Sequence, residues 1–410
     1  MNQTLLTNIH QLINVRQQPS LLRGGDLGQL PVINNAWLLI VNGRIADFGT
    51  MDAYPETSNI VDLKGASVLP CWCDSHTHLV FAASREEEFV DKIKGMSYAD
   101  IAAKGGGILN SARRLALTTE DELYTSAKKR LIELIRLGTG AIEIKSGYGL
   151  SVDAEIKMLR VIKRLKETSP IPIKSTFLGA HTYPELFKED HEGYIQQIID
   201  EMLPIIDREQ LADYIDVFCE TGFFSQEETV RICEAGKQIG LKPKIHANQL
   251  NLSGGVQAGI KTGAVSVDHL ETMDDASIQL LASSNTIGTL LPTAAYFLRM
   301  PFQPARKLID AGAAIALASD FNPGSSPSGN MNMVVSMSCI QMKMLPEEAI
   351  NAATLNGAYA MEQEKEVGSI TVGKRANLII TQPIPSIAYL PYAFGSNLID
   401  KVLINGEVFG

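Results

Sequence analysis

Eight short apolar runs alternate with longer helical stretches through the middle of the chain, and this alternation limits the possible folds more than any other feature. The runs begin near residues 67–69, 141–144, 173–177, 214–218, 244–246, 264–267, 287–291 and 314–317. Helices are predicted over residues 120–137, 153–167 and 226–239, the last with Ser225 as N-cap and Gly240 as C-cap. Strands that alternate with helices build a parallel sheet, and eight such units close a barrel. The sequence therefore predicts an α/β protein with a (β/α)8 TIM-like barrel.

The two ends of the chain have a different pattern. Short strand-like segments occur at residues 36–41, 42–46, 377–381 and 402–406, and the dipeptides Asn42-Gly43 and Asn405-Gly406 are typical of tight hairpin turns. We predict a small β-sandwich domain composed of residues 1–65 and 365–410. The barrel, the expected catalytic domain, then spans residues 66–364.

Composition excludes several classes of function. Hydrophobic residues make up 45% of the 410 residues and charged residues 20%, which is typical of a globular protein with a large core. The net charge of -10 has the wrong sign for a protein that binds nucleic acid or an anionic membrane. The sequence contains neither an export signal nor an apolar stretch long enough to span a bilayer, so we expect a cytoplasmic protein.

Histidines gather at the predicted strand ends. Of the seven, five stand at or just beyond the C-terminal ends of barrel strands, the face on which such barrels carry their active sites. His76 and His78 follow the first strand on one face of an extended segment, His246 closes the fifth strand, and Asp320 closes the eighth. Each alone also fits an ordinary strand end or a helix cap. Together they form a nitrogen and oxygen donor set suited to zinc or ferrous iron, so we predict a metal site.

Two further histidines are candidates for the chemistry. His269 ends the sixth strand, where side-chain alternation is expected to send Asp268 away from the face that His269 uses. We interpret His269 as an acid, base or oxyanion partner beside the metal. His181 follows the third strand and has the same two readings, functional or merely hydrogen-bonded. His10 and His191 are expected to be exposed to solvent.

Two other motifs carry less information. The run Cys71-Trp72-Cys73 has a chelating spacing, but it lies within the predicted first strand, where we expect barrel packing. The five cysteines suggest neither a thiolate ligand nor a disulfide. The glycine run 105–107 lacks the Lys-Ser/Thr pair of a phosphate loop, and we expect a mobile active-site loop there.

These residues resemble the amidohydrolase superfamily, with a His-Thr-His pair after the first strand, histidines at the fifth and sixth, and an aspartate at the eighth. The tail 368–379 is similar to the segment by which many members re-enter their β-sandwich domain, although Asn377 stands where aspartate is more usual. The resemblance covers nearly the whole chain.

Five narrower blocks, at residues 78–85, 143–150, 177–181, 246–250 and 320–325, resemble members that open a cyclic amide bearing a propanoate arm in histidine breakdown. The resemblance implies one zinc or iron ion on His76, His78, His246 and Asp320, and a homodimer. It also implies substrate contacts from Arg85, Tyr148, His181, Gln249, Asn322, Gly324 and Ser325. Gln249 stands where some members have glutamate, so we expect no carboxylate base at this position.

Opening a cyclic amide requires a nucleophile, donors for the developing oxyanion and a proton for the departing nitrogen. A bound metal supplies the nucleophile by lowering the pKa of water to about 7. We expect Asp320 to shuttle the proton, with His269 as its orienting partner, and Arg85 to bind the propanoate through two hydrogen bonds. The metal, together with His269 or His181, is expected to stabilise the developing oxyanion.

Three alternatives remain open at this stage. Glu220, after the fourth strand, leaves a binuclear metal site possible, although we expect a single ion. Another amidohydrolase, resembling cytosine deaminase or dihydroorotase, would share the same ligands. A non-catalytic scaffold would keep the barrel, but such proteins usually lack some of the ligands, and all four positions are filled here.

Overall fold

A parallel barrel forms the larger part of the computed structural model, which describes residues 3–96, 104 and 106–410. In the described part of the chain its sheet has eight strands in chain order. These are β6 (Trp72–Asp74), β7 (Thr139–Lys145), β8 (Ile173–Ala180), β9 (Tyr214–Cys219), β10 (Lys242–Ala247), β11 (Ser266–His269), β12 (Ile287–Leu290) and β13 (Ile315–Leu317). A parallel bridge between Thr77 and Phe321 joins the ends of the first and last strands. The predicted fold class is confirmed.

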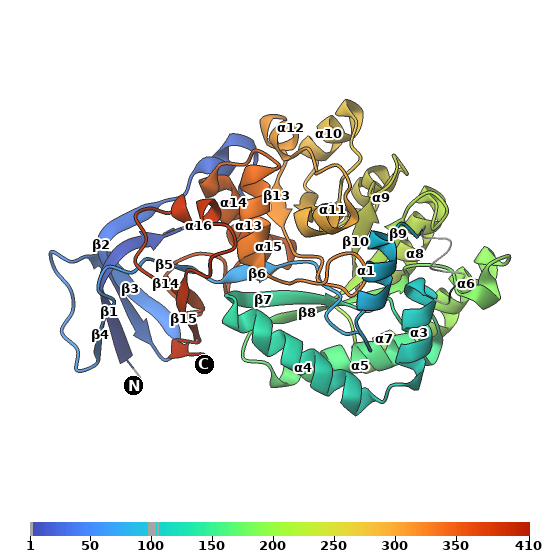
Figure 1. Ribbon diagram of the computed structural model, residues 1–410, viewed down its shortest axis with the longest axis horizontal. Coiled ribbons are helices and arrows are strands. Elements are labelled where there is room, and N and C mark those ends of the chain that lie inside the picture. Colours follow the sequence, from blue (N-terminus) through green and yellow to red (C-terminus); the bar gives the residue numbers. More distant parts are fainter. Residues whose placement is uncertain (1–2, 97–103, 105) are drawn as a thin grey trace.

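Helices surround this barrel (Figure 1). They are α1 (Glu86–Ile93), α3 (Gly107–Leu117), α4 (Glu120–Arg136), α5 (Val152–Thr168), α6 (His191–Gln197), α7 (Leu203–Glu209), α8 (Gln226–Gln238), α9 (Gly255–Thr262), α10 (Asp275–Ala282), α11 (Pro292–Leu298), α12 (Ala305–Asp310), α13 (Met331–Ile340), α14 (Pro346–Ala353) and α15 (Leu355–Ala360). The three predicted helices match α4, α5 and α8 to within a residue at each end. Ser225 caps α8 as predicted, because its side chain accepts from the backbone N–H of Glu228. Gly240 follows with a φ of 85°.

The first predicted strand is two strands in two different sheets, so that part of the prediction is wrong. Residues 68–70 form β5 (Val68–Pro70), which pairs with β1 and β14 of the other sheet, and only β6 belongs to the barrel. Pro70 has no N–H for a sheet ladder, and the N–H of Cys71 donates to the carbonyl of Asn377 at 3.0 Å. The chain therefore passes from one sheet to the other at Cys71.

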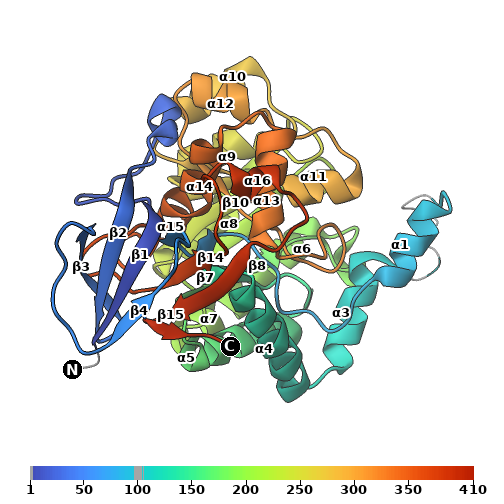
Figure 2. The same ribbon diagram turned by 60° about the vertical axis from the view of Figure 1, so that its left-hand side comes forward.

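Both chain ends build the second sheet (Figures 1 and 2). It combines β5 with β1 (Gln3–Ile13), β2 (Val32–Val41), β3 (Arg44–Thr50), β4 (Ile60–Asp62), β14 (Leu378–Thr381), β15 (Ile399–Ile404) and β16 (Glu407–Val408). Along the chain, the short helix α16 (Tyr389–Tyr392) follows β14 and precedes β15. The turns Asn42-Gly43 and Asn405-Gly406 both have positive φ at each residue, as tight hairpins require. Buried apolar side chains from both ends, such as Leu38, Val68 and Leu378, form a core of their own. The domain boundaries at 65 and 365 stay predictions.

The predicted glycine loop is different in the structure. Gly105 lies outside the described residues, whereas Gly106 caps α3 and Gly107 is its first residue. The expectation of a loop is therefore wrong for Gly107, whose N–H donates to Glu88 Oε1 at 3.0 Å, whereas Gly106 precedes the helix in an extended conformation. Cys71 and Cys73 are buried, as their interpretation as packing residues requires, and the structure contains no disulfide among the described cysteines.

Membrane-spanning helices are not found: in the described ranges, no helix combines the length and the apolar character that crossing a bilayer demands.

Candidate metal centre and active site

Backbone hydrogen bonds between the first and last strand ends fix three of the predicted ligands. The N–H of Asp320 donates to the carbonyl of His76 at 3.0 Å, and the N–H of His78 donates to the carbonyl of Phe321 at 2.9 Å. Asp320 has a φ of 53°, a left-handed conformation that is uncommon for a residue with a side chain and that concentrates at functional sites. Closure of the barrel thus holds His76, His78 and Asp320 side by side.

The four predicted ligand side chains converge. Asp320 Oδ1 lies 3.5 Å from His76 Nε2 and 3.6 Å from His78 Nε2, and His78 Nε2 lies 3.4 Å from His246 Nε2. All four residues are buried. The structure therefore brings together, at one end of the barrel, the side chains that the sequence analysis placed there.

The environment of these imidazoles fits a cation. His76 Nε2 is buried without a hydrogen-bond partner, and the Nε2 atoms of His78 and His246 face each other. Burial, with the neighbouring Lys145 ammonium, lowers the pKa of His76 and His78 well below the usual value. Neutral imidazoles keep their lone pairs available, and three of them with one carboxylate suit zinc or iron.

Two carboxylates lie behind these imidazoles, on the Nδ1 side of the rings. Asp268 Oδ2 lies 2.7 Å from His76 Nδ1, and Asp216 Oδ2 lies 3.0 Å from His246 Nδ1. Lys145 Nζ contacts Asp216 Oδ2 at 2.8 Å. Asp216 and Lys145 are not among the site residues predicted from the sequence. Lys145 follows Glu143 by two residues in an otherwise uncharged strand, and Asp216 is the one charged residue of the strand 214–219. Charge within a buried barrel strand is the signal that could have found them.

The expected separation of Asp268 from His269 is wrong. Both side chains lie beside the His76 ring: Asp268 bonds its Nδ1, and the His269 ring centroid is 5.5 Å from the His76 centroid. His269 has a φ of 86°, so the strict alternation of an extended strand ends before it. His269 Nδ1 is 3.3 Å from Glu271 Oε1. Although burial opposes it, the Glu271 carboxylate raises the pKa of His269 above the usual value.

A cavity of about 540 Å³ carries the predicted substrate contacts. Its wall includes Arg85, Tyr148, His181, Gln249, Asn322, Gly324 and Ser325, joined by apolar side chains such as Phe218 and Leu298. His181 Nδ1 donates to the carbonyl of Gly147 at 2.8 Å, and its ring stacks on His78. Burial, then the nearby His246, lowers the pKa of His181 to about 3, so its imidazole is neutral.

The loop after β13 is organised by Asn322. Its Oδ1 accepts from the N–H groups of Gly324 and Ser325, each at 2.8 Å. Ser325 Oγ in turn lies 3.3 Å from Asp320 Oδ2. Burial, partly offset by His269, raises the pKa of Asp320 to about 6. This loop therefore connects the cavity wall to the Asp320 carboxylate.

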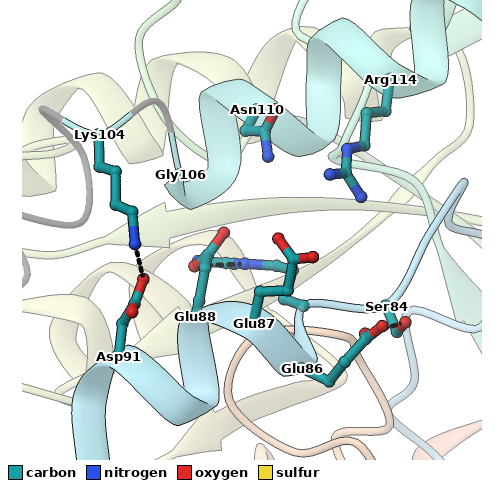
Figure 3. A pocket seen from close by; sticks show the side chains of 10 residues that line it. Ser84, Glu86, Glu87, Glu88, Asp91, Lys104, Gly106, Asn110 and Arg114 are labelled. Carbon is teal, nitrogen blue, oxygen red and sulfur yellow. Dashed lines mark hydrogen bonds and ion pairs between the residues drawn. The ribbon is translucent and has the colours of Figure 1, made fainter. Parts of the chain in front are cut away.

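Arg85 stands between the cavity and a second, outer hollow. Glu86, Glu87, Glu88 and Asp91 of α1 line this hollow together with Arg114 of α3 and Lys104, which pairs with Asp91 (Figure 3). Glu88 Oε2 accepts from Arg85 Nε at 2.9 Å. The Arg85 guanidinium is therefore held in place before any substrate arrives.

Glu220 has a structural role in the loop after β9. Its carboxylate accepts from the N–H groups of Thr221, Leu250 and Asn251 at 2.7, 2.8 and 3.2 Å. These bonds occupy both oxygens and tie the segment after His246 to the neighbouring strand end. They do not support a binuclear site on Glu220. His10 and His191 are exposed, as expected.

Comparison with known proteins agrees with this geometry. The model of the amidohydrolase family matches residues 67–409. The chain therefore belongs to the amidohydrolase family, whose metal chemistry and barrel match the fold and the site described above. It is 58% identical over 408 residues to the imidazolonepropionase of Flavobacterium johnsoniae, which covers 99% of both chains. It is 56% identical to that of Christiangramia forsetii, over 98% of this chain and 99% of the relative. Within the family the chain groups with the imidazolonepropionases and is a hydrolase.

Solved structures show the same fold at low identity. A triazine hydrolase variant matches with a TM-score of 0.74 and 15% identity, over 99% of this chain and 94% of the other. The guanine deaminase of E. coli has a TM-score of 0.73 and 13% identity, over 100% and 99%. An adenosine deaminase from Xanthomonas campestris with bound zinc has a TM-score of 0.68 and 16% identity, over 99% and 92%. The family implies a divalent metal.

Proposed function

We propose that this enzyme hydrolyses the ring amide of 4-imidazolone-5-propanoate to N-formimidoyl-L-glutamate, a step of histidine degradation. The observation that carries the proposal is the convergence of His76, His78, His246 and Asp320 at one end of the barrel, beside a cavity with Arg85 in its wall. Relatives named imidazolonepropionase at 55–58% identity support it.

The metal is a single zinc or iron ion held by these four side chains. When bound, it supplies Lewis acidity and lowers the pKa of water to about 7, which makes an attacking nucleophile available at neutral pH. His76 and His246 are each backed by an aspartate on Nδ1, which leaves Nε2 as the donor atom. His78 presents its Nε2 to the same position.

Asp320 carries the proton. Its Oδ1 faces His76 and His78, whereas its Oδ2 faces Ser325 on the cavity side. One carboxylate therefore faces both the metal-binding imidazoles and the cavity, as a shuttle to the departing ring nitrogen must. His269, held by Glu271, is its orienting partner and donates to the developing oxyanion. The neutral His181 ring already uses its one N–H on the Gly147 carbonyl, so it offers the substrate an acceptor at Nε2.

Arg85 binds the propanoate. A buried carboxylate needs a cationic partner, and a guanidinium satisfies it through two parallel hydrogen bonds. Tyr148, Gln249, Asn322, Gly324 and Ser325 complete the wall around the ring. Because Gln249 is uncharged, it serves as a hydrogen-bonding contact and not as the general base.

Incubation of the metal-loaded protein with freshly generated imidazolone propanoate tests the proposal. We expect N-formimidoylglutamate, detected by mass spectrometry, with either Zn²⁺ or Fe²⁺. His246→Asn is expected to lose metal and activity. His10→Asn removes an exposed histidine of β1 in the second sheet and is expected to retain both. Release of ammonia from a nucleobase, with no turnover of the imidazolone, would instead favour a deaminase. A purified protein that takes up no metal would favour a scaffold.

The cellular setting completes the proposal. We propose a cytoplasmic enzyme that acts as a homodimer on this small molecule, without nucleic acid or membrane as partner. The acidic net charge of -10 and the five free cysteines support this setting. The mass of the purified protein in solution tests the dimer.

A further inference from the structure

A layer of buried charge lies directly below the proposed metal position. Lys145 on β7, Asp216 on β9 and Asp268 on β11 have fully buried side chains, and these three strands alternate around the barrel. Alternate strands contribute side chains to one layer of a barrel interior. The three charges therefore occupy one level of the core, where neutral aliphatic side chains usually stand.

The contacts in this layer lead to two of the metal-binding imidazoles. Lys145 Nζ lies 2.8 Å from Asp216 Oδ2 and 3.6 Å from Asp268 Oδ2. The same two oxygens lie 3.0 Å from His246 Nδ1 and 2.7 Å from His76 Nδ1. One ammonium group thus bridges the two carboxylates that hold His76 and His246.

We infer that Lys145 is a positioning residue that fixes His76 and His246, through Asp268 and Asp216, in the tautomer with a proton on Nδ1. A carboxylate oxygen only accepts, so His76 Nδ1, which is hydrogen-bonded to Asp268, carries the proton and its Nε2 keeps the lone pair for the metal. His246 Nδ1 lies 3.0 Å from Asp216 Oδ2 without forming a hydrogen bond, and the nearby negative charge favours the same tautomer. Without the ammonium, two fully buried carboxylates lose their shared cation and repel one another. The imidazoles then lose the acceptors that orient them.

Lys244 provides a matched comparison inside the same core. Its side chain is equally buried, and it pairs with Glu143 and donates to the carbonyls of Ser75 and Ala360 at 3.1 and 3.2 Å. Among the acidic side chains in the described ranges, Glu143 is its ion-pair partner, and Asp216 and Asp268 are not. Lys244→Met therefore removes a buried ammonium that forms no ion pair with either bridged aspartate. The two lysines share Glu143, and the Lys244 charge acts on Asp268 only from a distance.

The first test measures affinity for Zn²⁺ alone, by titration of the metal-free full-length protein against a chromophoric chelator. We expect Lys145→Met to weaken binding roughly ten- to hundredfold, the usual effect of losing a partner of a ligating histidine, and Lys244→Met to change it less than about threefold. Equal losses in both variants, or no loss in Lys145→Met, would overturn the inference. Circular dichroism checks that each variant is folded, and Lys145→Gln replaces Lys145→Met if the latter does not fold.

The second test reads the tautomers directly. In the ¹⁵N-histidine NMR spectrum of the metal-free wild type, His76 and His246 are expected to show Nδ1–H signals. In Lys145→Met these signals are expected to weaken or to appear together with Nε2–H signals. In Lys244→Met the Nδ1–H signals are expected to persist. A purely structural role of Lys145 would lower stability without changing the tautomers. An Nε2–H signal from either imidazole in the wild type would overturn the inference even if no variant folds.

This inference rests on the metal site of the proposed function, and the two can fail separately. A wild-type protein that binds no Zn²⁺ would overturn the proposed function itself. A wild type that binds Zn²⁺, with Lys145→Met binding it equally well, would overturn only the role of Lys145.

Discussion

Arg85 and Glu88 form an ion pair across the first turn of α1: Arg85 Nε donates to Glu88 Oε2 at 2.9 Å, and Nη2 donates to the same oxygen. The other oxygen of Glu88 accepts from the N–H of Gly107 at the start of α3. Although partial burial opposes it, Arg85 keeps the pKa of Glu88 below its usual value. Glu88 therefore fixes the guanidinium while Nη1 faces Gly324 in the cavity wall.

Replacement of Arg85 by lysine is expected to raise KM for the propanoate substrate by roughly ten- to hundredfold, because charge-assisted hydrogen bonds are worth about 1.5–3 kcal/mol and lysine cannot form the two-pronged contact. The measurement is steady-state kinetics of Arg85→Lys beside the wild type. An analogue without the carboxylate serves as the control and is expected to show little difference between the two enzymes. An unchanged KM for the propanoate substrate would remove Arg85 from the binding site.

A substitution at Gly324 provides a second test of the role of Arg85. A Cβ placed on Gly324 would come within 2.3 Å of Arg85 Nη1, so Gly324→Ala is expected to push the guanidinium aside. The displaced atom ends a flexible side chain and Gly324 has no positive φ, so stability is expected to change little. KM is expected to rise while the melting temperature stays within about 2 °C of the wild type, because the added methyl group meets the movable end of a long side chain and no backbone atom.

The matched control for this variant is Gly25→Ala, since nothing lies within 4 Å of an added Cβ there. It is expected to leave both KM and the melting temperature unchanged. If Gly324→Ala lowers the melting temperature strongly and KM stays constant, the Arg85 guanidinium does not move aside to make room for the added methyl group.

Asp320→Asn tests the proton shuttle. The amide keeps the size of the side chain and can still ligate through oxygen, but it cannot accept and release the proton. We expect kcat to fall by about 10²–10⁴, the usual contribution of a general acid or base. The metal content of the variant is measured in the same sample at saturating Zn²⁺. A variant that retains the metal and most of kcat would contradict the assignment.

The position of the ligand cluster could be predicted from the sequence because it follows from the topology of the barrel. His76, His78, His246 and Asp320 each stand at the C-terminal end of a strand, and parallel strands bring those ends to one face. The structure brings these side chains together at that face. The hairpin dipeptides and the Ser225 cap were equally predictable, since each depends on a few neighbouring residues.

Other features depend on contacts between distant segments. The division of residues 68–74 into β5 and β6 follows from a bond between Cys71 and Asn377, which are far apart in the sequence. Asp268 and His269 both lie beside His76 because the backbone of His269 is left-handed, which the local sequence does not indicate. The ion pairs of Lys145 join three strands, so no single strand pattern reveals them.

The buried Lys374 is expected to make the free energy of unfolding depend on pH in the alkaline range. This side chain is 3% exposed and donates to the carbonyl of Val367 at 2.9 Å and to Ser369 Oγ at 2.7 Å. Burial lowers the pKa of Lys374 from 10.5 to about 8. Between pH 8 and 10.5 the unfolded chain holds a proton that the folded chain has released, so raising the pH favours folding. Below pH 8 both states hold the proton, and the folded state bears the full cost of a buried ammonium.

Comparison with Lys374→Met isolates this effect from the titration of other groups. The free energy of unfolding of the wild type minus that of the variant is expected to rise between pH 8 and 10.5, by on the order of 3 kcal/mol because each pKa unit is about 1.4 kcal/mol. Urea denaturation at several pH values across this window provides the measurement. Lys401→Met, which removes an exposed ammonium of β15, is the control and is expected to leave the pH dependence unchanged. A difference between wild type and Lys374→Met that stays flat or falls with pH would show that Lys374 keeps its proton in the folded state.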